Sequence, residues 1–277
     1  MKKCALDLSV KSVKRLHERY VLITLTDSKP LPDMLPGQFV EILVEGSPST
    51  FLRRPISINF VDREKNELWL LVATVGDGTR RLAQLKEGER LNCVLPLGNG
   101  FSLPTGANAT WSEKGTGNAV LLVGGGVGVA PLLYLGATLK KQGIEPTFLL
   151  GARTKNDLLM LDVFRKYGRV LVTTEDGSEG EQGFVTNHSV LSTEHFDLIQ
   201  CCGPTPMMKA VASYARKNQI PCEVSLENLM ACGLGACLCC VEKVKRSDDY
   251  DTSEASVTNV CVCKEGPVFN INRLLWD

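Results

Sequence analysis

The chain has 277 residues, of which 44% are apolar and 22% are charged, and its 31 basic residues balance its 31 acidic residues. This length predicts one large domain or two to three smaller ones, and the composition is typical of a folded protein. The neutral net charge gives no electrostatic reason to expect nucleic acid or an anionic membrane as a partner.

The first twenty residues, MKKCALDLSVKSVKRLHERY, contain no sustained apolar run, so we expect no secretory signal. The eleven cysteines are odd in number and unevenly spaced, unlike a disulfide framework. We therefore expect a cytoplasmic protein whose thiols stay reduced and are free to bind metal.

Short apolar runs separated by turn residues fill residues 1–103, the expected first domain. Strands of this length at such close spacing are typical of an antiparallel β-barrel or sandwich. One helix is predicted at Gly78–Leu85, where the apolar spacing is helical. The expected strands are Tyr20–Thr26, Gln38–Val44, Ser57–Val61, Glu67–Thr74 and Arg90–Leu95.

Two stretches of this first domain are suited to bind phosphate. In the stretch FLRRPISI, Arg54 can clamp a phosphate and Ser57 can hydrogen-bond a ring nitrogen or carbonyl. The stretch GDGT opens the predicted helix, where the N–H groups of Gly78 and Thr79 can meet a second phosphate edge. Taken alone, an arginine on a strand is more often a solvated charge.

A change of pattern marks the second domain, expected over residues 117–222 after a polar linker at Pro104–Asn118. Apolar strands alternate here with helices, which predicts a parallel α/β sheet covered on both faces. The expected strands are Ala119–Val123, Thr147–Gly151, Val170–Thr174 and Leu198–Cys202, and the expected helices are Pro131–Gln142, Lys155–Tyr167 and Pro206–Asn218.

The apolar stretch Ala119–Lys140 is long enough to span a bilayer and carries no charge before Lys140. Its inner GGGVGVAP argues against a membrane helix, because these glycines suit a buried strand, a tight loop and a helix start. We therefore expect no membrane segment.

Bare backbone amides at this helix start favour an anion such as a dinucleotide pyrophosphate. GGGVGVAP departs from the G-x-G-x-x-G pattern, so alone it could be a tight strand–helix turn. A second strand end, CGPTPM from Cys202, lies at the same edge of the predicted sheet. Two glycine-rich strand ends that converge on one crevice indicate a cofactor site.

Residues 223–277 form the expected third domain, which is small and cysteine-rich and contains a polar loop at Lys245–Ser256. Three of its cysteines follow the C-x4-C-x2-C spacing of plant-type [2Fe-2S] proteins, which need a fourth cysteine further on. These three are Cys232, Cys237 and Cys240, and the fourth is either Cys261 or Cys263.

Gly233 and Gly235 support this reading, because a chain that wraps a small inorganic core needs positive φ angles that glycine adopts easily. Three alternatives remain open. Zinc could use four thiolates, a C-x-x-C pair could be redox-active, or the thiols could be inert. The zinc ligands would be Cys237, Cys240, Cys261 and Cys263.

The order of RPIS, GDGT, GGGVGVAPL and CGPTPMM resembles the ferredoxin–NAD(P) reductase superfamily. Within it, EVSLENLMACGLGACLCCV and the closing CKEGPVF resemble the electron-transfer subunits of the NAD-dependent class of dihydroorotate dehydrogenase. The resemblance covers essentially the whole chain. The fold class that it implies is multidomain α+β: an antiparallel β-barrel FAD domain, a parallel α/β nucleotide-binding domain and a small C-terminal [2Fe-2S] domain.

The resemblance implies a role for each matching residue. FAD would contact Arg54, Pro55, Ile56, Ser57, Leu71, Val72, Ala73, Gly78 and Thr79. NAD would be received by Gly124, Gly125, Gly126, Gly128, Pro131, Cys202, Gly203 and Pro204. The cluster would be held by Cys232, Cys237, Cys240 and Cys263. The gap before Cys263 is longer than in the family, so Cys261 stays open as the fourth ligand.

These cofactors together imply an electron relay, because FAD exchanges single electrons with a cluster and a hydride with NAD. The implied partner is a catalytic subunit that carries FMN and oxidises dihydroorotate, in a heterotetramer of two plus two chains. No acid–base set for that substrate is evident in the sequence, so we expect no catalytic residue here. The choice between NAD and NADP stays open, since Arg153 could meet a 2′-phosphate or be solvated.

Two rival functions remain. One is the small subunit of an NADH-dependent ferredoxin–NADP reductase or of a sulfide dehydrogenase, a group in which an aspartate stands where this chain has Cys232. The other, of a different class, is a zinc-bearing interaction module in which the two larger domains serve as scaffold.

Overall fold

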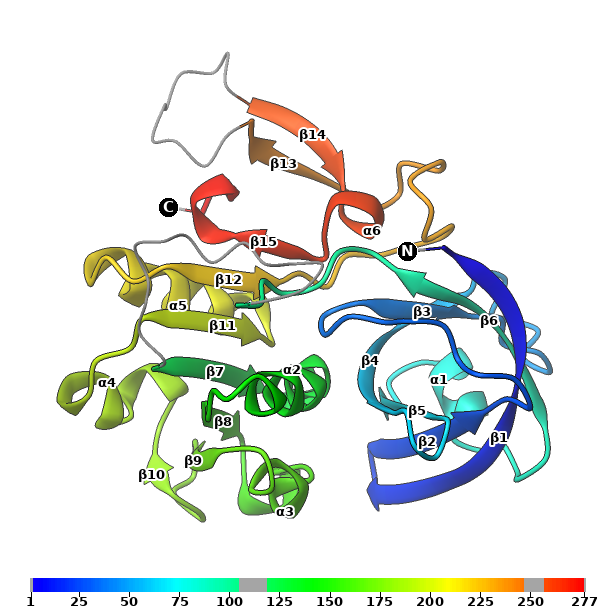
Figure 1. The fold of residues 1–277 in the computed structure, drawn as a ribbon, viewed down its shortest axis with the longest axis horizontal. Coiled ribbons are helices and arrows are strands. Elements are labelled where there is room, and N and C mark those ends of the chain that lie inside the picture. The colour runs from blue at the N-terminus through cyan, green and yellow to red at the C-terminus, as the bar shows by residue number, and fades with distance from the viewer. Residues whose placement is uncertain (1, 105–118, 247–256, 277) are drawn as a thin grey trace.

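The computed structural model describes residues 2–104, 119–246 and 257–276. These residues form a closed barrel, a seven-stranded sheet and a two-stranded hairpin, which lies above the sheet in Figure 1. The expected linker from residue 105 on, and the expected polar loop from residue 247 to 256, lie outside the described residues.

The barrel has six antiparallel strands in the order β1-β2-β5-β4-β3-β6, as the alternating runs predict. Side chains that point inward, such as Ile23, Val40 and Leu70, are fully buried in its core. The strands are β1 (Cys4–His17), β2 (Tyr20–Thr26), β3 (Phe39–Ile42), β4 (Arg54–Asp62), β5 (Glu67–Ala73) and β6 (Arg90–Leu97), and the one barrel helix is α1 (Asp77–Leu82).

Strand β1 is absent from the expected strands, although it closes the barrel by pairing with both β2 and β6. Its sequence mixes apolar positions with lysine, serine and arginine along 14 residues. Because one face of this strand is largely exposed, it lacks the dense apolar character by which the other strands are found.

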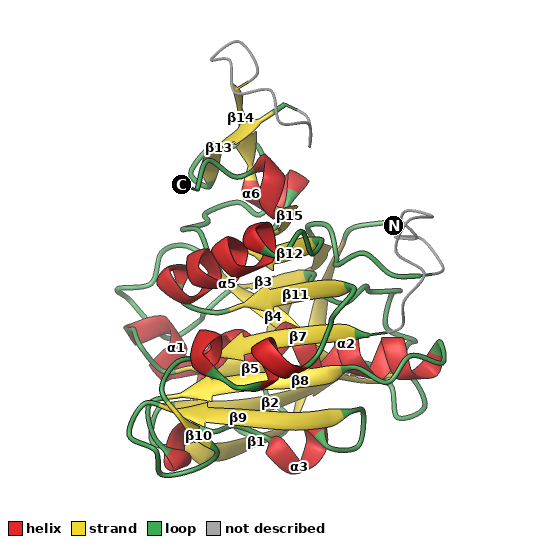
Figure 2. Ribbon diagram, turned by 90° about the vertical axis from the view of Figure 1, so that its left-hand side faces the viewer, coloured by secondary structure: helices red, strands yellow, loops and turns green. Residues whose placement is uncertain are grey.

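The sheet runs in the order β10-β9-β8-β7-β11-β12-β15, and Figure 2 shows these strands one above another. All neighbours pair in parallel except β12 and β15, which are antiparallel. The strands are β7 (Val120–Gly125), β8 (Thr147–Ala152), β9 (Arg169–Thr174), β10 (Glu181–Gln182), β11 (Leu198–Cys202), β12 (Cys222–Ser225) and β15 (Val268–Asn270).

Alternate residues of β7 enter two different cores, as expected for a strand buried on both faces. Val120 and Leu122 pack in the core that contains α2 and α3, and Leu121 and Val123 pack in the core that contains α5. The sheet helices are η1 (Gly126–Val129), α2 (Ala130–Lys141), η2 (Lys155–Asp157), α3 (Leu161–Phe164), η3 (Val185–Asn187), α4 (Val190–Thr193) and α5 (Thr205–Lys217).

The long helix expected at Lys155–Tyr167 is wrong in detail, because the segment forms two short pieces, η2 and α3. Met160 stands between them with a φ of 57°, which an α-helix does not allow. The apolar stretch Ala119–Lys140 folds as β7, η1 and α2. Across the ranges that the structure describes, no helix combines the length and the apolar character needed to cross a membrane.

Helix α2 lies between the sheet and the barrel and fixes one to the other (Figure 1). The buried Asn59 of β4 donates its side-chain N–H to the carbonyl of Ala130, at 2.9 Å. Tyr134 donates its hydroxyl to the carbonyl of Met34, at 3.2 Å. The barrel is thereby anchored at the start of the helix that follows the glycine-rich loop.

The C-terminal segment is joined to both larger units. It contains the hairpin β13 (Val241–Lys245) and β14 (Val257–Cys261), then α6 (Val262–Glu265), β15 and η5 (Ile271–Arg273). Asn99, just after β6, donates its backbone N–H to Gly266 at 2.6 Å and its side-chain amide to Glu265 at 3.0 Å. The cysteine-rich segment is therefore docked on the barrel while β15 extends the sheet.

Gly136 of α2 should not tolerate a side chain, although alanine is normally better than glycine in a helix. A Cβ there would lie 2.2 Å from Cζ of Phe148 on β8. We expect Gly136→Ala to lower the free energy of unfolding by about 1–3 kcal/mol, the usual cost of overpacking. Urea denaturation measures this, and Gly136→Ala combined with Phe148→Leu should recover part of the loss. A Gly136→Ala chain that is more stable than the parent would contradict the contact.

Candidate functional site

The two glycine-rich strand ends meet backbone to backbone, as the sequence indicates. β7 and β11 are parallel neighbours, with Gly124 opposite Cys202. A Cβ on Gly128 would lie 2.5 Å from the Cα of Gly203 and 2.6 Å from the carbonyl oxygen of Cys202. Any larger residue at Gly128 would force the two strand ends apart.

The residues around these two strand ends are equally close-packed. A Cβ on Gly125 would lie 2.6 Å from Sδ of Met207 and 3.3 Å from Pro204. Gly126 has a φ of 56° and approaches the hydroxyl of Tyr20 on the barrel. Pro131 occupies the first turn of α2. The glycine-rich loop therefore lies at the carboxyl ends of the parallel strands, next to the barrel, where doubly wound sheets bind dinucleotides.

The thiol of Cys202 stands at this strand end and is 1% exposed. Burial raises the pKa of Cys202 above its ordinary value, and the charge of Glu227 acts in the same direction. The thiol is therefore neutral and packs as an apolar group in a hydrophobic core.

Three barrel segments converge on Gly78, at the start of α1. A Cβ on Gly78 would lie 2.9 Å from Cγ2 of Thr50 and 3.4 Å from Cγ of Arg54. The guanidinium of Arg54 is bonded only to the nearby carbonyl of Leu52, at 3.0 and 3.2 Å, among the contacts that the structure describes. A half-buried arginine without an acid partner, beside a glycine, can bind a phosphate by donating hydrogen bonds to it.

Exposed apolar side chains stand on the segments just before Arg54 and just before α1. Phe51 is 89% exposed and Val75 is 79% exposed, and Leu52 is also exposed. Solvent-exposed apolar residues beside a cation suit a ligand that combines rings with phosphates. The barrel edge thus fits the flavin dinucleotide that the motifs predict.

The remaining barrel positions differ in what they can offer. The side chains of Leu71 and Val72 are buried in hydrophobic cores, so only the backbone of these two residues can face a ligand. Ala73 is half-buried and pairs with Tyr20. The hydroxyl of Thr79 is bonded to the backbone of Gly76 and closes the turn before α1.

The PIS residues lie on β4 opposite β3. Ser57 pairs with Phe39 and Pro55 pairs with Glu41, so these four side chains share the outward face of the barrel. Ile56 instead packs against the barrel core. The outward face points to the C-terminal segment, because Phe39 belongs to the same hydrophobic core as Cys240 and Cys263.

The four cysteines with cluster spacing are grouped as two pairs. Cys232 and Cys237 are partly or fully exposed, whereas Cys240 and Cys263 are buried. The Cys240 thiol acts on the pKa of both Cys263 and Cys261. Within the described ranges, no three His, Cys, Asp or Glu side chains gather around one point. Two pairs of thiols fit two irons, each of which takes two thiolates.

The outer pair is surrounded by backbone amides. Partial burial raises the pKa of Cys232, but the N–H groups of Leu234, Cys237 and Ala236, together with the Cys237 thiol, lower it to about 6. The N–H of Leu234 lies 3.3 Å from the sulfur. Gly233 and Gly235 have φ angles of 65° and 83°, which confirms the expectation that glycine shapes this loop. A sulfur that is a thiolate near neutral pH is ready to bind iron.

The inner pair is buried. Cys240 is 2% exposed and Cys263 is 1% exposed. Burial, and then the neighbouring Cys240 thiol, raise the pKa of Cys263 to about 12. The N–H of Cys263 lies 3.3 Å from Sγ of Cys240. Cys261 is only partly buried, and its thiol donates to the carbonyl of Gly235 at 3.8 Å. The Cys240 thiol acts on Cys261 as well as on Cys263, so the deeper burial of Cys263 is what favours it as the partner of Cys240.

One acidic residue at this place is missed by the sequence motifs. Glu41 of β3 is fully buried, and both of its carboxyl oxygens lack a hydrogen-bond partner in the part of the chain that the structure describes. Burial raises the pKa of Glu41 to about 7, with Arg54 and Arg53 acting against the rise and Cys232 acting with it. The signal in the sequence is one charge inside the apolar run QFVEILV.

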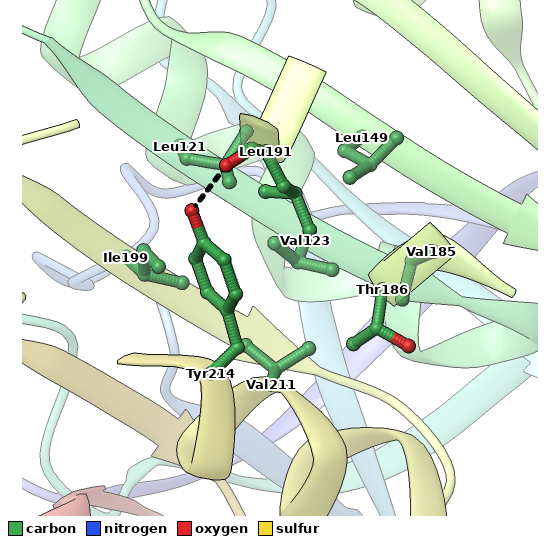
Figure 3. A pocket seen from close by; sticks show the side chains of 9 residues that line it. All are labelled: Leu121, Val123, Leu149, Val185, Thr186, Leu191, Ile199, Val211 and Tyr214. Atoms are coloured by element: carbon green, nitrogen blue, oxygen red, sulfur yellow. Dashed lines mark hydrogen bonds between the residues drawn. The ribbon is translucent and has the colours of Figure 1, made fainter. Parts of the chain in front are cut away.

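A separate hollow lies on the α5 side of the sheet (Figure 3). It is apolar, and Tyr214 donates its hydroxyl to the carbonyl of Leu191 across it, at 2.7 Å. No charged side chain lines it, so it offers nothing to a dinucleotide. Its lining residues are Leu121, Val123, Leu149, Val185, Thr186, Leu191, Ile199, Val211 and Tyr214.

Family models match the two C-terminal units. Residues 227–275 match the iron–sulfur cluster binding domain of dihydroorotate dehydrogenase B. Residues 122–213 match an oxidoreductase NAD-binding domain.

The chain is 37% identical over 268 residues to the dihydroorotate dehydrogenase B (NAD(+)) electron transfer subunit of Bacillus pumilus, with 96% of each chain covered. It is 39% identical over 238 residues to the same subunit of Fusobacterium nucleatum subsp. nucleatum, with 84% of each covered. Among solved structures, an NADH-dependent reduced ferredoxin-NADP oxidoreductase involved in flavin-based electron bifurcation matches with a TM-score of 0.79 and 31% identity, over 100% of this chain and 92% of that chain. The chain therefore belongs to the family of electron transfer subunits of dihydroorotate dehydrogenase B (NAD(+)).

Proposed function

We propose that this chain passes electrons from the FMN of a catalytic partner subunit, through a [2Fe-2S] cluster and FAD, to NAD⁺. The partner oxidises dihydroorotate in the de novo synthesis of pyrimidines (UMP). The observation that carries the proposal is that four cysteines with cluster spacing, two accessible and two buried, lie on a segment docked against the barrel. FAD, when bound, supplies the exchange between single electrons and a hydride.

The cluster ligands in this proposal are the outer pair Cys232 and Cys237 and the inner pair Cys240 and Cys263. The amides around Cys232 stabilise negative charge on its sulfur. The buried inner pair shields one side of the site from water. Cys239 is exposed and belongs to neither pair.

The flavin site in this proposal is the barrel edge from Arg54 to Ser57 together with the start of α1. Arg54 clamps the pyrophosphate, because its guanidinium has no acid partner among the described contacts. Gly78 lets the phosphates approach, since a side chain there would meet Thr50 and Arg54. Ser57 presents a hydroxyl toward the outward face of the barrel, and Leu71, Val72 and Ala73 contribute backbone.

The nicotinamide dinucleotide is proposed to lie in the crevice between Gly124–Gly128 and Cys202–Pro204. The glycines allow close approach of the ligand to the backbone. Pro131 starts α2 directly behind this loop. The crevice adjoins the barrel at Tyr20, so the two dinucleotides would meet at that contact.

The partner surface is proposed on the loop that carries the outer cysteine pair. Leu229, Leu234 and Leu238 are 85%, 49% and 64% exposed. Exposed leucines beside an electron-transfer centre suit a protein partner. We propose that two such chains join two catalytic subunits in a heterotetramer, and that the complex is cytoplasmic.

A second candidate function is the small subunit of an NADH-dependent ferredoxin–NADP reductase, which the structural similarity over the whole chain favours. The two candidates differ in the partner that supplies electrons. Orotate formation after the chain is combined with its native partner selects the first. Exchange with ferredoxin and NADP in place of orotate formation selects the second.

Cys237→Ser should remove the visible absorbance of the cluster and leave bound flavin, because it takes one thiolate from the outer iron. Cys239→Ser is the matched control, since Cys239 is also exposed and lies two residues away. Iron analysis and the visible spectrum after anaerobic purification measure the effect. Zinc in place of iron in the parent protein would instead support the zinc-module alternative.

Cys263→Ser and Cys261→Ser should separate the two candidates for the fourth ligand. We expect Cys263→Ser to lose most of the iron, because Cys263 is the partner of Cys240. Cys261→Ser should keep iron close to two atoms per chain, the content of a [2Fe-2S] centre. The opposite result would move the ligand assignment to Cys261.

The purified chain alone should oxidise NADH with an artificial electron acceptor but should form no orotate from dihydroorotate. The reason is that cofactor sites are present, whereas the substrate is assigned to the catalytic partner. Absorbance assays for NADH consumption and for orotate measure both activities. Orotate formation by the single chain would refute the division of labour between the two subunits.

A further inference from the structure

Glu41 occupies the seam between the barrel and the cysteine loop. Its Cα is opposite Pro55 of the flavin motif, and its side chain points out of the barrel. A Cβ on Gly233 would lie 2.6 Å from Cγ of Glu41 and 2.8 Å from Cδ1 of Leu97. The carboxyl group therefore lies against the residue that follows the first cluster cysteine.

The seam gives this carboxyl no hydrogen-bond partner among the described residues. The guanidinium of Arg53 donates to Asn92, at 2.5 Å to its side chain and 3.1 Å to its backbone, and to the backbone carbonyl of Glu41 at 3.3 Å. The guanidinium of Arg54 donates to Leu52. Both arginines are near enough to attract the carboxylate, but neither donates a hydrogen bond to it. Arg53 and Arg54 therefore act on the carboxylate through charge alone, and Cys232 of the cysteine loop also lies within range of its charge.

We propose that the negative charge of Glu41 lowers the reduction potential of the cluster. One-electron reduction adds one negative charge to the cluster. A carboxylate in a buried, poorly screened seam opposes that added charge more strongly than it would in water. Net charge near a cluster and its hydrogen bonds are the main means by which proteins set its potential. The inference rests on the proposed cluster site.

A lower potential has a functional consequence for the same relay. It makes the reduced cluster a stronger donor to an acceptor on the barrel side. Glu41 lies on the outward barrel face that also carries Ser57 and Pro55, between the flavin motif and the cysteine loop. Glu41 therefore lies where its charge can act on the cluster.

The test is a spectroelectrochemical titration of the iron-loaded, flavin-bound chain, with the parent and Glu41→Gln compared in alkaline buffer. Glutamine keeps the shape and removes the charge. We expect the cluster midpoint of Glu41→Gln to shift to a more positive potential, with iron content unchanged. Equal midpoints in the two proteins would overturn the proposal.

Two further variants separate charge from packing. Glu67→Gln removes another buried barrel carboxyl, which pairs with Lys11 at 2.7 Å, and should leave the midpoint at the parent value. Glu41→Asp keeps the charge but withdraws it from Gly233, so its midpoint should fall between those of the parent and Glu41→Gln. A midpoint for Glu41→Asp as high as that of Glu41→Gln would assign the effect to packing and overturn the proposal.

If Glu41→Gln fails to load iron, Glu41→Asp decides alone. A midpoint above the parent value supports the proposal, and a midpoint equal to it overturns the proposal. An iron-free parent chain would instead refute the cluster site itself, so failure of the proposed function can be told apart from failure of this inference.

Discussion

The cysteine segment is held against the barrel by a close backbone contact, the hydrogen bond from Asn99 to Gly266. Asn99 follows the last barrel strand, and Gly266 follows the short helix that carries Cys263. A Cβ on Gly98 would lie 2.6 Å from Pro267, so these two segments can approach this closely only with glycine at that position. The next residue along, Val268, begins the strand that extends the sheet. A single short stretch thereby fixes the cysteine segment to both larger units.

The sheet and the barrel are joined by the same means at a second point. Asn59 reaches from the barrel to the start of α2, and the glycine-rich loop before α2 touches both Tyr20 and the β11 strand end. Because each of these contacts involves backbone, they leave little freedom for one unit to shift against another. Proteins that move electrons between bound groups need such fixed relative positions. Here the positions follow from where glycine and asparagine stand in the sequence.

The sequence predicts the parts of this fold that depend on local pattern. The barrel strands with dense apolar character, the four expected parallel strands and the helix after GGGVGVAP are found where the pattern places them, whereas the parallel strands β10 and β12 are not among the expected strands. β1 escapes prediction because its face is largely exposed. β15 escapes because three residues, Val268–Asn270, carry no pattern of their own and become a strand only by pairing with β12.

The candidate sites divide in the same way. Cysteine spacing selects a ligand set, but the partner of Cys240 cannot be read from spacing, since Cys261 and Cys263 differ by two residues. Burial distinguishes them in the folded chain. The flavin motif marks Arg54 and Ser57, whereas Leu71 and Val72 prove to have their side chains in hydrophobic cores.

Glu41 shows what a motif cannot indicate. In the sequence it is a single acid within an apolar strand, and such a residue is normally expected to face water. It faces another part of the chain instead, because the cysteine segment covers the outward side of β3. A buried carboxyl without a hydrogen-bond partner costs folding free energy, so a hydrophobic side chain of similar size would be expected to stabilise the seam. Arg53 and Arg54 offset part of that cost through charge alone. Since the seam separates the proposed flavin site from the proposed cluster, the cost falls where a fixed negative charge can act on electron transfer.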